Sequence, residues 1–212
     1  TALQSTFTPR AGTPGQYSWL PVTPQEARAL RKISIVACGT AYHAGVLGKY
    51  AIERLARVPV EAEIASEYRY RDPIVGENEL FIAVSQSGET ADTLAALREA
   101  KRRGARVMAI CNVVGSTITR EAGEENTLYT YAGPEIAVAS TKAYITQAEL
   151  MVMLAVALAD LRGQISPERA AQLMEGLADL PRKAEQALAV EEQLQRLTSM
   201  LSQKRHVFFV GR

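Results

Sequence analysis

The sequence predicts an α/β fold in which helices cover both faces of a five-stranded parallel sheet. Short runs rich in Val, Ile and Leu alternate with stretches of helical periodicity along most of the 212 residues. Runs of this length and composition are typical of strands buried on both faces, and their alternation with helices favours parallel pairing. The predicted strands are 33–37, 58–64, 80–84, 106–111 and 127–131.

The segments between these strands have helical patterns. We expect helices over Tyr42–Arg57, Thr90–Arg103 and, more briefly, Thr117–Gly123. In the second of these, apolar residues recur at helical spacing, and Gly104 follows in the position that commonly ends a helix.

The pattern changes after residue 140, where a long apolar helix is expected over roughly 141–162. Two further helices are expected over roughly 167–179 and 182–203. The last residues, His206–Gly211, repeat the arrangement of a basic residue, an apolar run and a glycine that also occurs before Gly39. We therefore expect a buried strand there, which would begin a second α/β unit that is cut short.

Four segments follow from these patterns. Residues 1–24 are rich in Thr, Pro and Gly and are expected to be a linker or arm, whereas 25–162 form the α/β domain. Residues 163–203 are expected to be connecting helices, and 204–212 the start of a truncated second domain.

Composition excludes several classes of function. A formal net charge of +1 gives no electrostatic case for nucleic acid or an anionic membrane. No uninterrupted apolar stretch is long enough to span a bilayer, and the N-terminus lacks a signal pattern, so the cytoplasm is expected. Cys38 and Cys111 have no CxxC spacing, which favours buried thiols over a disulfide or a metal site.

The most informative motif is the loop Ser85–Thr90, with the sequence SQSGET. It follows a predicted strand and precedes a predicted helix, where unpaired N–H groups carry a partial positive charge. Helix capping needs one hydroxyl, but this loop has three, together with an amide and a glycine. A phosphate or sugar-hydroxyl site is therefore favoured over a purely structural loop. The GxxxxGK[ST] and GxGxxG patterns are absent, which disfavours binding of nucleoside triphosphates and of dinucleotides.

Two other polar loops follow predicted strands and reach the same edge of the sheet. In Cys38–Ala41, the simplest role for Thr40 is helix capping. In Gly133–Lys142, Ser140 and Thr141 are expected either to cap the next helix or to contact a ligand. Glu135 and Lys142 are the ionisable groups nearest this loop, and either could orient a ligand.

The chain offers little for acid–base or nucleophilic catalysis. Its only histidines are His43, near the first polar loop, and His206, which precedes the last predicted strand. No Ser/His/Asp arrangement, metal cluster or close carboxylate pair is visible. We therefore expect no catalytic residue, no metal and no cofactor in this chain.

Five segments form a specific combination: Ala37–Tyr42 (ACGTAY), Glu63–Arg71 (EIASEYRYR), Ser85–Leu94 (SQSGETADTL), Ile110–Asn112 (ICN) and Val138–Lys142 (VASTK). This combination resembles the sugar isomerase (SIS) domain family, and more closely the first SIS domain of the glucosamine-6-phosphate synthases. The resemblance covers roughly 25–162 and, more loosely, the helices to 203. It implies a three-layer αβα sandwich.

The resemblance also implies a hexose-6-phosphate site. The residues matching the family's phosphate loop are Ser85, Gln86, Ser87 and Thr90, and those matching its sugar-lining positions are Cys38, Gly39, Thr40, Val138 and Ser140. One departure is Ala41, where many members have a serine whose hydroxyl can help at the phosphate.

The resemblance further implies partners outside this chain. Family enzymes make glucosamine 6-phosphate from fructose 6-phosphate and glutamine, with a glutaminase domain in front and a second SIS domain behind. The second domain supplies the acid–base groups, so the chain alone is expected to bind sugar phosphate and to be inactive. Homodimers are expected. The alternatives are a non-catalytic sugar-phosphate sensor and a stand-alone sugar-phosphate isomerase or deglycase.

Overall fold

The computed structural model describes residues 1–136 and 140–208. The chain divides into two compact units, Thr1–Ala178 and Asp179–Arg212. The first unit contains the sheet and the candidate site, and the second contains two helices. Each unit is described by itself.

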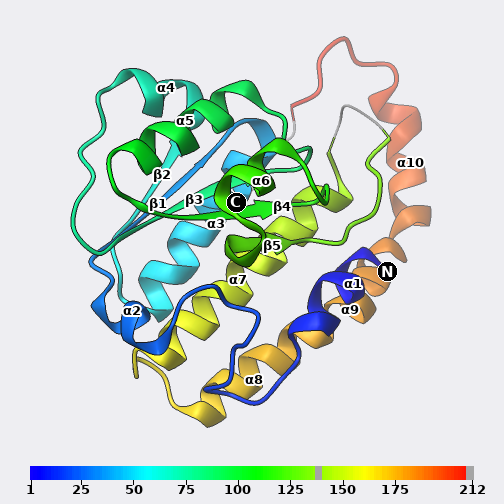
Figure 1. Ribbon diagram of the computed structural model, residues 1–212. Helices are drawn as coiled ribbons and strands as arrows, with labels where there is room; N and C mark the ends of the chain where they lie inside the picture. The colour runs from blue at the N-terminus through cyan, green and yellow to red at the C-terminus, as the bar shows by residue number, and fades with distance from the viewer. Residues whose placement is uncertain (137–139, 209–212) are drawn as a thin grey trace. The chain divides into compact units, whose positions relative to one another are not determined.

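Five parallel strands form one sheet in the order β2-β1-β3-β4-β5 (Figure 1). The parallel sheet that the sequence predicts is therefore confirmed. The bounds of the strands are β1 Lys32–Ala37, β2 Val60–Ile64, β3 Glu79–Ser85, β4 Arg106–Cys111 and β5 Thr127–Tyr129.

Two of these strands are shorter than the sequence predicts, and each has a local cause. β2 begins at Val60 instead of 58, because Pro59 has no N–H to contribute to the ladder. β5 ends at Tyr129 instead of 131, because Tyr131 has a φ of 51° and leaves the extended conformation.

Helices cover both faces of the sheet, as predicted. The helices of this unit are α1 Ala2–Phe7, α2 Pro24–Ala29, α3 Gly39–Leu55, α4 Ala65–Tyr70, α5 Ala91–Arg102, α6 Thr117–Ala122, α7 Lys142–Leu161 and α8 Pro167–Ala178. α4, α5 and α6 lie on one face, and α3 and α7 pack together on the other (Figure 1). The sequence analysis did not predict α4.

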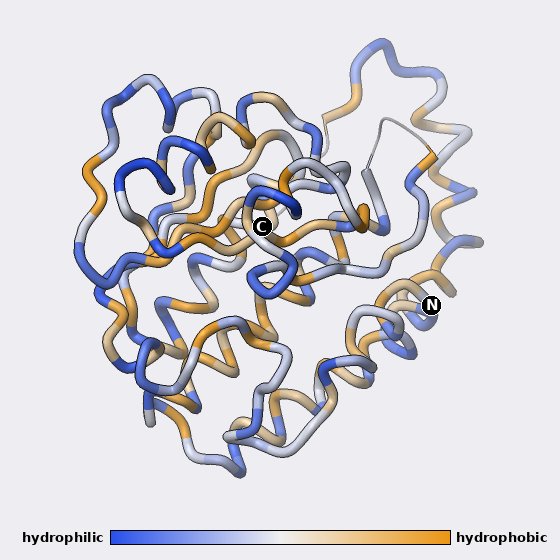
Figure 2. The backbone as a smooth tube through the Cα atoms, viewed as in Figure 1, coloured by the Kyte–Doolittle hydropathy of each residue, from blue (hydrophilic) through white to orange (hydrophobic). Residues whose placement is uncertain are grey.

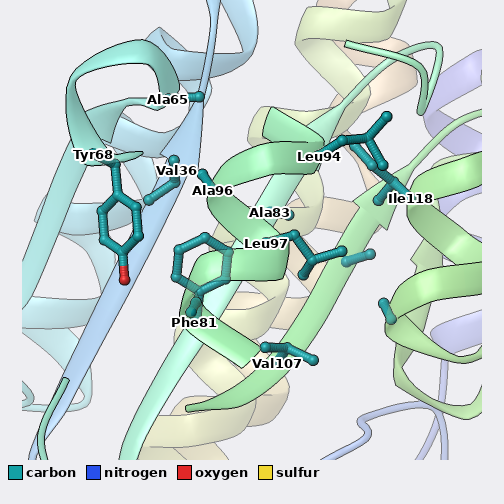
Figure 3. Close-up of a cluster of buried hydrophobic side chains, with 13 residues drawn as sticks. Val36, Ala65, Tyr68, Phe81, Ala83, Leu94, Ala96, Leu97, Val107 and Ile118 are labelled. Carbon is teal, nitrogen blue, oxygen red and sulfur yellow. The ribbon is translucent and has the colours of Figure 1, made fainter. Parts of the chain in front are cut away.

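The core beneath α4, α5 and α6 consists of interdigitating small and large side chains. The Tyr68 and Phe81 rings pack at a tilt of 57° with 5.2 Å between their centroids, and Leu97 and Ile118 are fully buried in the same cluster (Figure 3). The middle strands β3 and β4 carry nearly continuous hydrophobic runs, which can be followed in Figure 2. Burial of this kind contributes about 1.5 to 3 kcal/mol for each large side chain, so the core fixes where the loops at the strand ends lie.

Helix α3 begins three residues earlier than predicted. The sequence analysis placed Gly39, Thr40 and Ala41 in a loop before Tyr42, but they form the first turn of the helix. The sequence has no strong capping residue at this point, because the N-cap is Cys38, which makes no side-chain cap hydrogen bond. Gly39 has a φ of 58°, which suits a glycine at the strand-to-helix turn.

The N-terminal segment, expected from the sequence to be a linker or arm, contains a short helix that packs on the rest of the unit. Thr8–Arg10 continues α1 as a 3₁₀ turn, η1, and α1 packs against α7. The Thr6 hydroxyl donates to the carbonyl of Thr130, and the Arg10 guanidinium donates to the carbonyls of Thr6 and Tyr129. These contacts are long-range, so the local composition of residues 1–24 could not predict them.

Helix α7 is the central helix of the unit. It is long and apolar enough to cross a membrane by length and composition, but 72% of its most apolar window is buried inside the protein. It packs against α3, α1 and α8. The long apolar helix that the sequence predicts over roughly 141–162 is therefore a core helix of this unit.

The second unit contains α9 Leu180–Leu188 and α10 Glu191–Leu201. The sequence analysis expected one helix over 182–203, but the helix breaks at Ala189 and Val190. Within the described residues, His206–Phe208 have no strand assignment, and the rest of that predicted strand lies outside them. The segment boundaries drawn from the sequence stay predictions.

Candidate functional site

A pocket of about 420 Å³ lies at the carboxyl ends of β1 and β3, beside the first turns of α3, α5 and α7. This is the edge where ligands bind in open α/β sheets. The residues that line it are Cys38, Gly39, Thr40, Ala41, Val84, Ser85, Gln86, Ser87, Thr90, Glu135, Ser140 and Gln147. The structure thus brings together every predicted site residue except Val138, which lies outside the described residues.

The loop from Ser85 to Thr90 is held by its own hydroxyls. The Ser85 Oγ accepts a hydrogen bond from the N–H of Gly88 at 3.0 Å, and the Ser87 Oγ accepts one from the N–H of Glu89 at 3.2 Å. Ser85 and Thr90 also pair through their hydroxyl oxygens at 3.2 Å. The Ser87 hydroxyl still has a hydrogen to donate, and so does one hydroxyl of the Ser85–Thr90 pair. The loop is therefore pre-shaped and retains donors.

Gly88 is required where it stands. Its φ is 70°, which disfavours any side chain. A Cβ at this position would overlap the Ser116 side chain and lie 2.9 Å from the Cys111 Sγ. Burial raises the pKa of the Cys111 thiol, which packs beneath the loop as a small apolar group. Gly88 thus lets the loop lie directly on the β4–α6 connection.

The N-terminus of α5 opens towards the pocket without a side-chain cap. Thr90 is the N-cap residue, but its hydroxyl turns back to Ser85 instead of bonding the first turn of the helix. Within the described part of the chain, no side chain caps this helix end. The free N–H groups and the positive end of the helix dipole are a ready site for an anion.

The β1–α3 connection forms the second wall of the pocket. Cys38 directly follows β1, and the Thr93 hydroxyl lies 4.0 Å from its Sγ atom. Thr40 is exposed in the first turn of α3 and is not the N-cap, so the capping role expected for it is wrong. Ala41 is buried against the pocket and presents a methyl group, with no hydroxyl there to donate.

The start of α7 forms the third wall. Ser140 lines the pocket, and Thr141 is the N-cap but makes no side-chain cap bond within the described residues. Instead, the Glu135 carboxylate accepts a hydrogen bond from the N–H of Ala143 at 3.1 Å. Glu135 is therefore the ionisable group of this loop that reaches the pocket, and Lys142 is not among the lining residues.

Gln147 is a pocket residue that the sequence analysis missed. It lies inside α7, is 1% exposed, and its Oε1 has no hydrogen-bond partner among the described residues. The available signal was a polar residue in the N-terminal half of a largely apolar helix. That signal alone does not tell which way the side chain points.

The charged groups around the pocket are few. Glu135 is the only ionisable side chain other than the Cys38 thiol among the described lining residues, and no Lys or Arg is among them. His43 is exposed on α3 and packs against Tyr42, with 5.3 Å between ring centroids. It does not line the pocket. Glu89 points to α6, because its carboxylate accepts from the N–H of Thr117 at 2.8 Å, which lowers its pKa.

Curated relatives match most of this chain. It is 59% identical over 187 residues to the glutamine–fructose-6-phosphate aminotransferase (isomerizing) of Symbiobacterium thermophilum, which covers 88% of this chain and 30% of that protein. It is 51% identical over 213 residues to the enzyme of the same name from Clostridium acetobutylicum, which covers 100% of this chain and 35% of that protein. The chain therefore spans about a third of the length of these relatives.

Solved structures also match this chain. The C-terminal domain of glucosamine-fructose-6-phosphate aminotransferase from Francisella tularensis has a TM-score of 0.91 and 37% identity, covering 100% of this chain and 59% of that one. Glucosamine-6-phosphate deaminase from Thermotoga maritima has a TM-score of 0.52 at 24% identity, covering 68% of this chain and 44% of that one, which shows the fold alone. The SIS domain family matches residues 28–157. The expected resemblance is confirmed, and the chain belongs to the SIS domain family.

Proposed function

We propose that this pocket binds a hexose 6-phosphate, with the phosphate on the loop Ser85–Thr90. The observation that carries the proposal is the uncapped start of α5. Thr90 is placed to cap the helix, yet its hydroxyl pairs with Ser85 and leaves the first-turn N–H groups without a side-chain cap, directly after a residue that lines a hydroxyl-rich pocket. A phosphate supplies the acceptors that these donors lack.

Neutral donors carry this phosphate site. The loop offers the hydroxyls of Ser85, Ser87 and Thr90 and the amide of Gln86, and no Lys or Arg lines the described pocket. Hydrogen bonds from neutral donors to a charged acceptor contribute about 1.5 to 3 kcal/mol each in favourable cases. Binding should therefore be modest in strength and less dependent on salt than binding at an arginine cluster.

The remaining walls suit the sugar. Cys38, Gly39 and Thr40 line one side of the pocket and Ser140 lines another. We assign Val138 to the sugar-lining set from its place in the VASTK segment. These residues are small, so the carbon chain of a hexose can pass between them.

We further propose that the chain works as part of a glutamine–fructose-6-phosphate aminotransferase. Ammonia released from glutamine in a glutaminase domain would aminate fructose 6-phosphate, and isomerisation would give glucosamine 6-phosphate. The names of the relatives support this assignment. Proton transfer between C1 and C2 needs a positioned acid and base, and the only ionisable side chains of the described pocket are Glu135 and the Cys38 thiol. A second SIS domain would supply the others, so the chain alone should bind sugar phosphate without turning it over.

Calorimetric titration of the 212-residue chain tests the binding proposal. Glucosamine 6-phosphate should bind, and glucosamine without the phosphate should not bind measurably. Ser87→Ala should weaken binding of the phosphorylated sugar about tenfold, the equivalent of one charge-assisted hydrogen bond. Ser66→Ala, on α4 and outside the pocket, is the matched control and should bind like the wild type. Equal affinity of wild type and Ser87→Ala would refute the assignment of the phosphate to this loop.

We also propose that the chain functions in the cytoplasm and pairs with a second copy. Support for pairing comes from α3, where Leu47 and Tyr50 are exposed one turn apart. Sedimentation equilibrium checks the pairing, and a monomer at high micromolar concentration would contradict it.

A further inference from the structure

Helix α7 places one buried amide against the pocket. Gln147 is 1% exposed on a helix in which thirteen of twenty residues are buried. Its neighbour Thr146 is equally buried, but the Thr146 hydroxyl donates within the helix to the carbonyls of Lys142 and Ala143, each at 3.0 Å. The Gln147 Oε1 has no such partner among the described residues.

An unpartnered buried amide is energetically unfavourable. Leaving one polar atom of this kind without a hydrogen bond costs about 1 to 3 kcal/mol, whereas an apolar side chain of similar size avoids the cost. Gln147 lines the pocket, so a molecule in the pocket can supply the missing partner. The amide can also exchange its O and N positions by turning about its last bond, so it can accept or donate.

The charges around the pocket determine which way round a sugar phosphate binds. The Glu135 carboxylate lines the α7 side, and the uncapped start of α5 lies at the loop after β3. A phosphate is repelled by the carboxylate and attracted by the helix end. The hydroxyl-bearing carbon chain therefore lies towards α7, where Gln147 is.

We propose that the side-chain amide of Gln147 hydrogen-bonds a hydroxyl group of the bound hexose 6-phosphate and thereby contributes to sugar specificity. This inference rests on the proposed function of the same pocket. It adds a recognition residue that lies inside a helix, away from the three loops that the sequence singled out. It also assigns a ligand partner to an amide whose oxygen lacks one among the described residues.

The melting temperature of the ligand-free protein distinguishes a purely structural role of Gln147 from a role in ligand binding. Gln147→Met removes the buried polar atoms and keeps the length of the side chain. If the amide serves the ligand, the empty variant should melt at the same temperature as the wild type or higher, because an unpartnered polar group has been removed. If the amide holds the fold together, the empty variant should melt several degrees lower.

Titration of the 212-residue chain tests the proposal. Gln147→Met should bind glucosamine 6-phosphate about tenfold more weakly, the equivalent of one hydrogen bond lost to the ligand. Binding of inorganic phosphate, followed by the shifts of amide signals, should be unchanged. Thr146→Val is the matched control: it removes an equally buried polar group that does not line the pocket, and it should leave sugar affinity unchanged.

A panel of monodeoxy hexose 6-phosphates identifies direct contact. For the sugar that lacks the contacted hydroxyl, wild type and Gln147→Met should bind equally. Unchanged affinity of Gln147→Met for glucosamine 6-phosphate would overturn the inference while leaving the proposed function intact. The same factor of loss for every deoxy sugar would also overturn it, because the effect would then be indirect. Failure of the wild type to bind either phosphate compound would instead refute the proposed function.

Discussion

Helices α2 and α5 both begin directly after a threonine, but the two threonines do opposite things. Thr23 accepts a hydrogen bond from the N–H of Glu26, and the Glu26 carboxylate accepts one from the N–H of Thr23 at 2.7 Å. Thr90 instead pairs with Ser85 and leaves the start of α5 open. One helix start is closed by its own side chains, and the other faces a pocket.

The difference teaches that a helix start becomes a binding site through what its capping residue does elsewhere. A closed capping box satisfies the first-turn N–H groups and stabilises the fold. An open start gives up that stabilisation and keeps its donors for a ligand. Changes at the α2 start should therefore affect stability, whereas changes at the open start should affect binding, unless they disturb the loop backbone itself.

The largest expected effect is a loss of stability at Gly88, in the loop that precedes the open start of α5. Gly88→Ala would force a left-handed φ on a side chain whose Cβ overlaps Ser116. We expect the free energy of unfolding to fall by roughly 3 kcal/mol or more. Gly104→Ala is the matched control, since Gly104 also has a positive φ of 88° but nothing lies within 4 Å of a Cβ there. It should cost about 1 kcal/mol, and urea unfolding measures both.

If Gly88→Ala and Gly104→Ala lowered the free energy of unfolding equally, the loop Ser85–Thr90 would have to adjust to a side chain at Gly88. The close packing of the loop on Ser116 and Cys111 would then not be what holds it.

The contrast between partnered and unpartnered groups extends to carboxylates. The Glu26 carboxylate is hydrogen-bonded, mainly to the backbone N–H of Thr23, and this lowers its pKa. Glu149 on α7 is only 3% exposed, and neither of its carboxyl oxygens has a hydrogen-bond partner among the described residues. Burial raises the pKa of Glu149 to about 8, against the opposing charge of Arg10. Because the folded pKa exceeds the unfolded value of 4.5, Glu149 stabilises the fold fully below pH 4.5, and that stability is lost as the pH rises through 8.

Glu149→Gln should remove this pH dependence. Between pH 5 and 8 the wild type should lose on the order of 2 kcal/mol relative to the variant in urea unfolding. Glu26 has the opposite pH dependence, since its lowered pKa gives stability that is lost as the pH falls. Glu26→Gln should therefore reduce the loss of unfolding free energy at acid pH. Parallel pH profiles of wild type and Glu149→Gln would show that the carboxyl group does not titrate in this range.

The smallest expected effects come from the two threonines themselves. Thr23→Val removes one cap bond and should lower the free energy of unfolding by about 1 kcal/mol without changing affinity for glucosamine 6-phosphate. Thr90→Val should weaken that affinity about tenfold and change stability by less than Thr23→Val. Urea unfolding and calorimetry on both variants check the crossed pattern. A loss of unfolding free energy at Thr90→Val as large as at Thr23→Val would contradict the conclusion that Thr90 does not stabilise the start of α5.

The sheet was the part most readily predicted from the sequence. The runs 33–37, 80–84 and 106–111 each lie within one residue of an observed strand, because a strand buried on both faces needs a continuous apolar run. Residues of all three predicted polar loops line one pocket, since parallel strands present their carboxyl ends together, although Gly39–Ala41 belong to α3 and not to a loop. What the sequence could not determine was which hydroxyls cap helices and which remain free.

The remaining elements were missed because their causes are not local. The arm 1–24 has the composition of a linker, yet Thr6 and Arg10 bind carbonyls more than a hundred residues away. The start of α3 at Gly39 has no capping signal, because Cys38 is the N-cap. Gln147 is indistinguishable in sequence from a polar residue at the surface of a helix. Its burial against the pocket depends on how α7 packs in the unit.

The central claim is that the open start of α5 holds the phosphate, and amide chemical shifts test it most directly. In the 212-residue chain titrated with glucosamine 6-phosphate, the amide signals of Ala91, Asp92 and Thr93 should move and saturate together. The signals of Gln25 and Glu26, at the closed start of α2, should stay in place. A saturating titration in which the three α5 signals do not move would contradict the account.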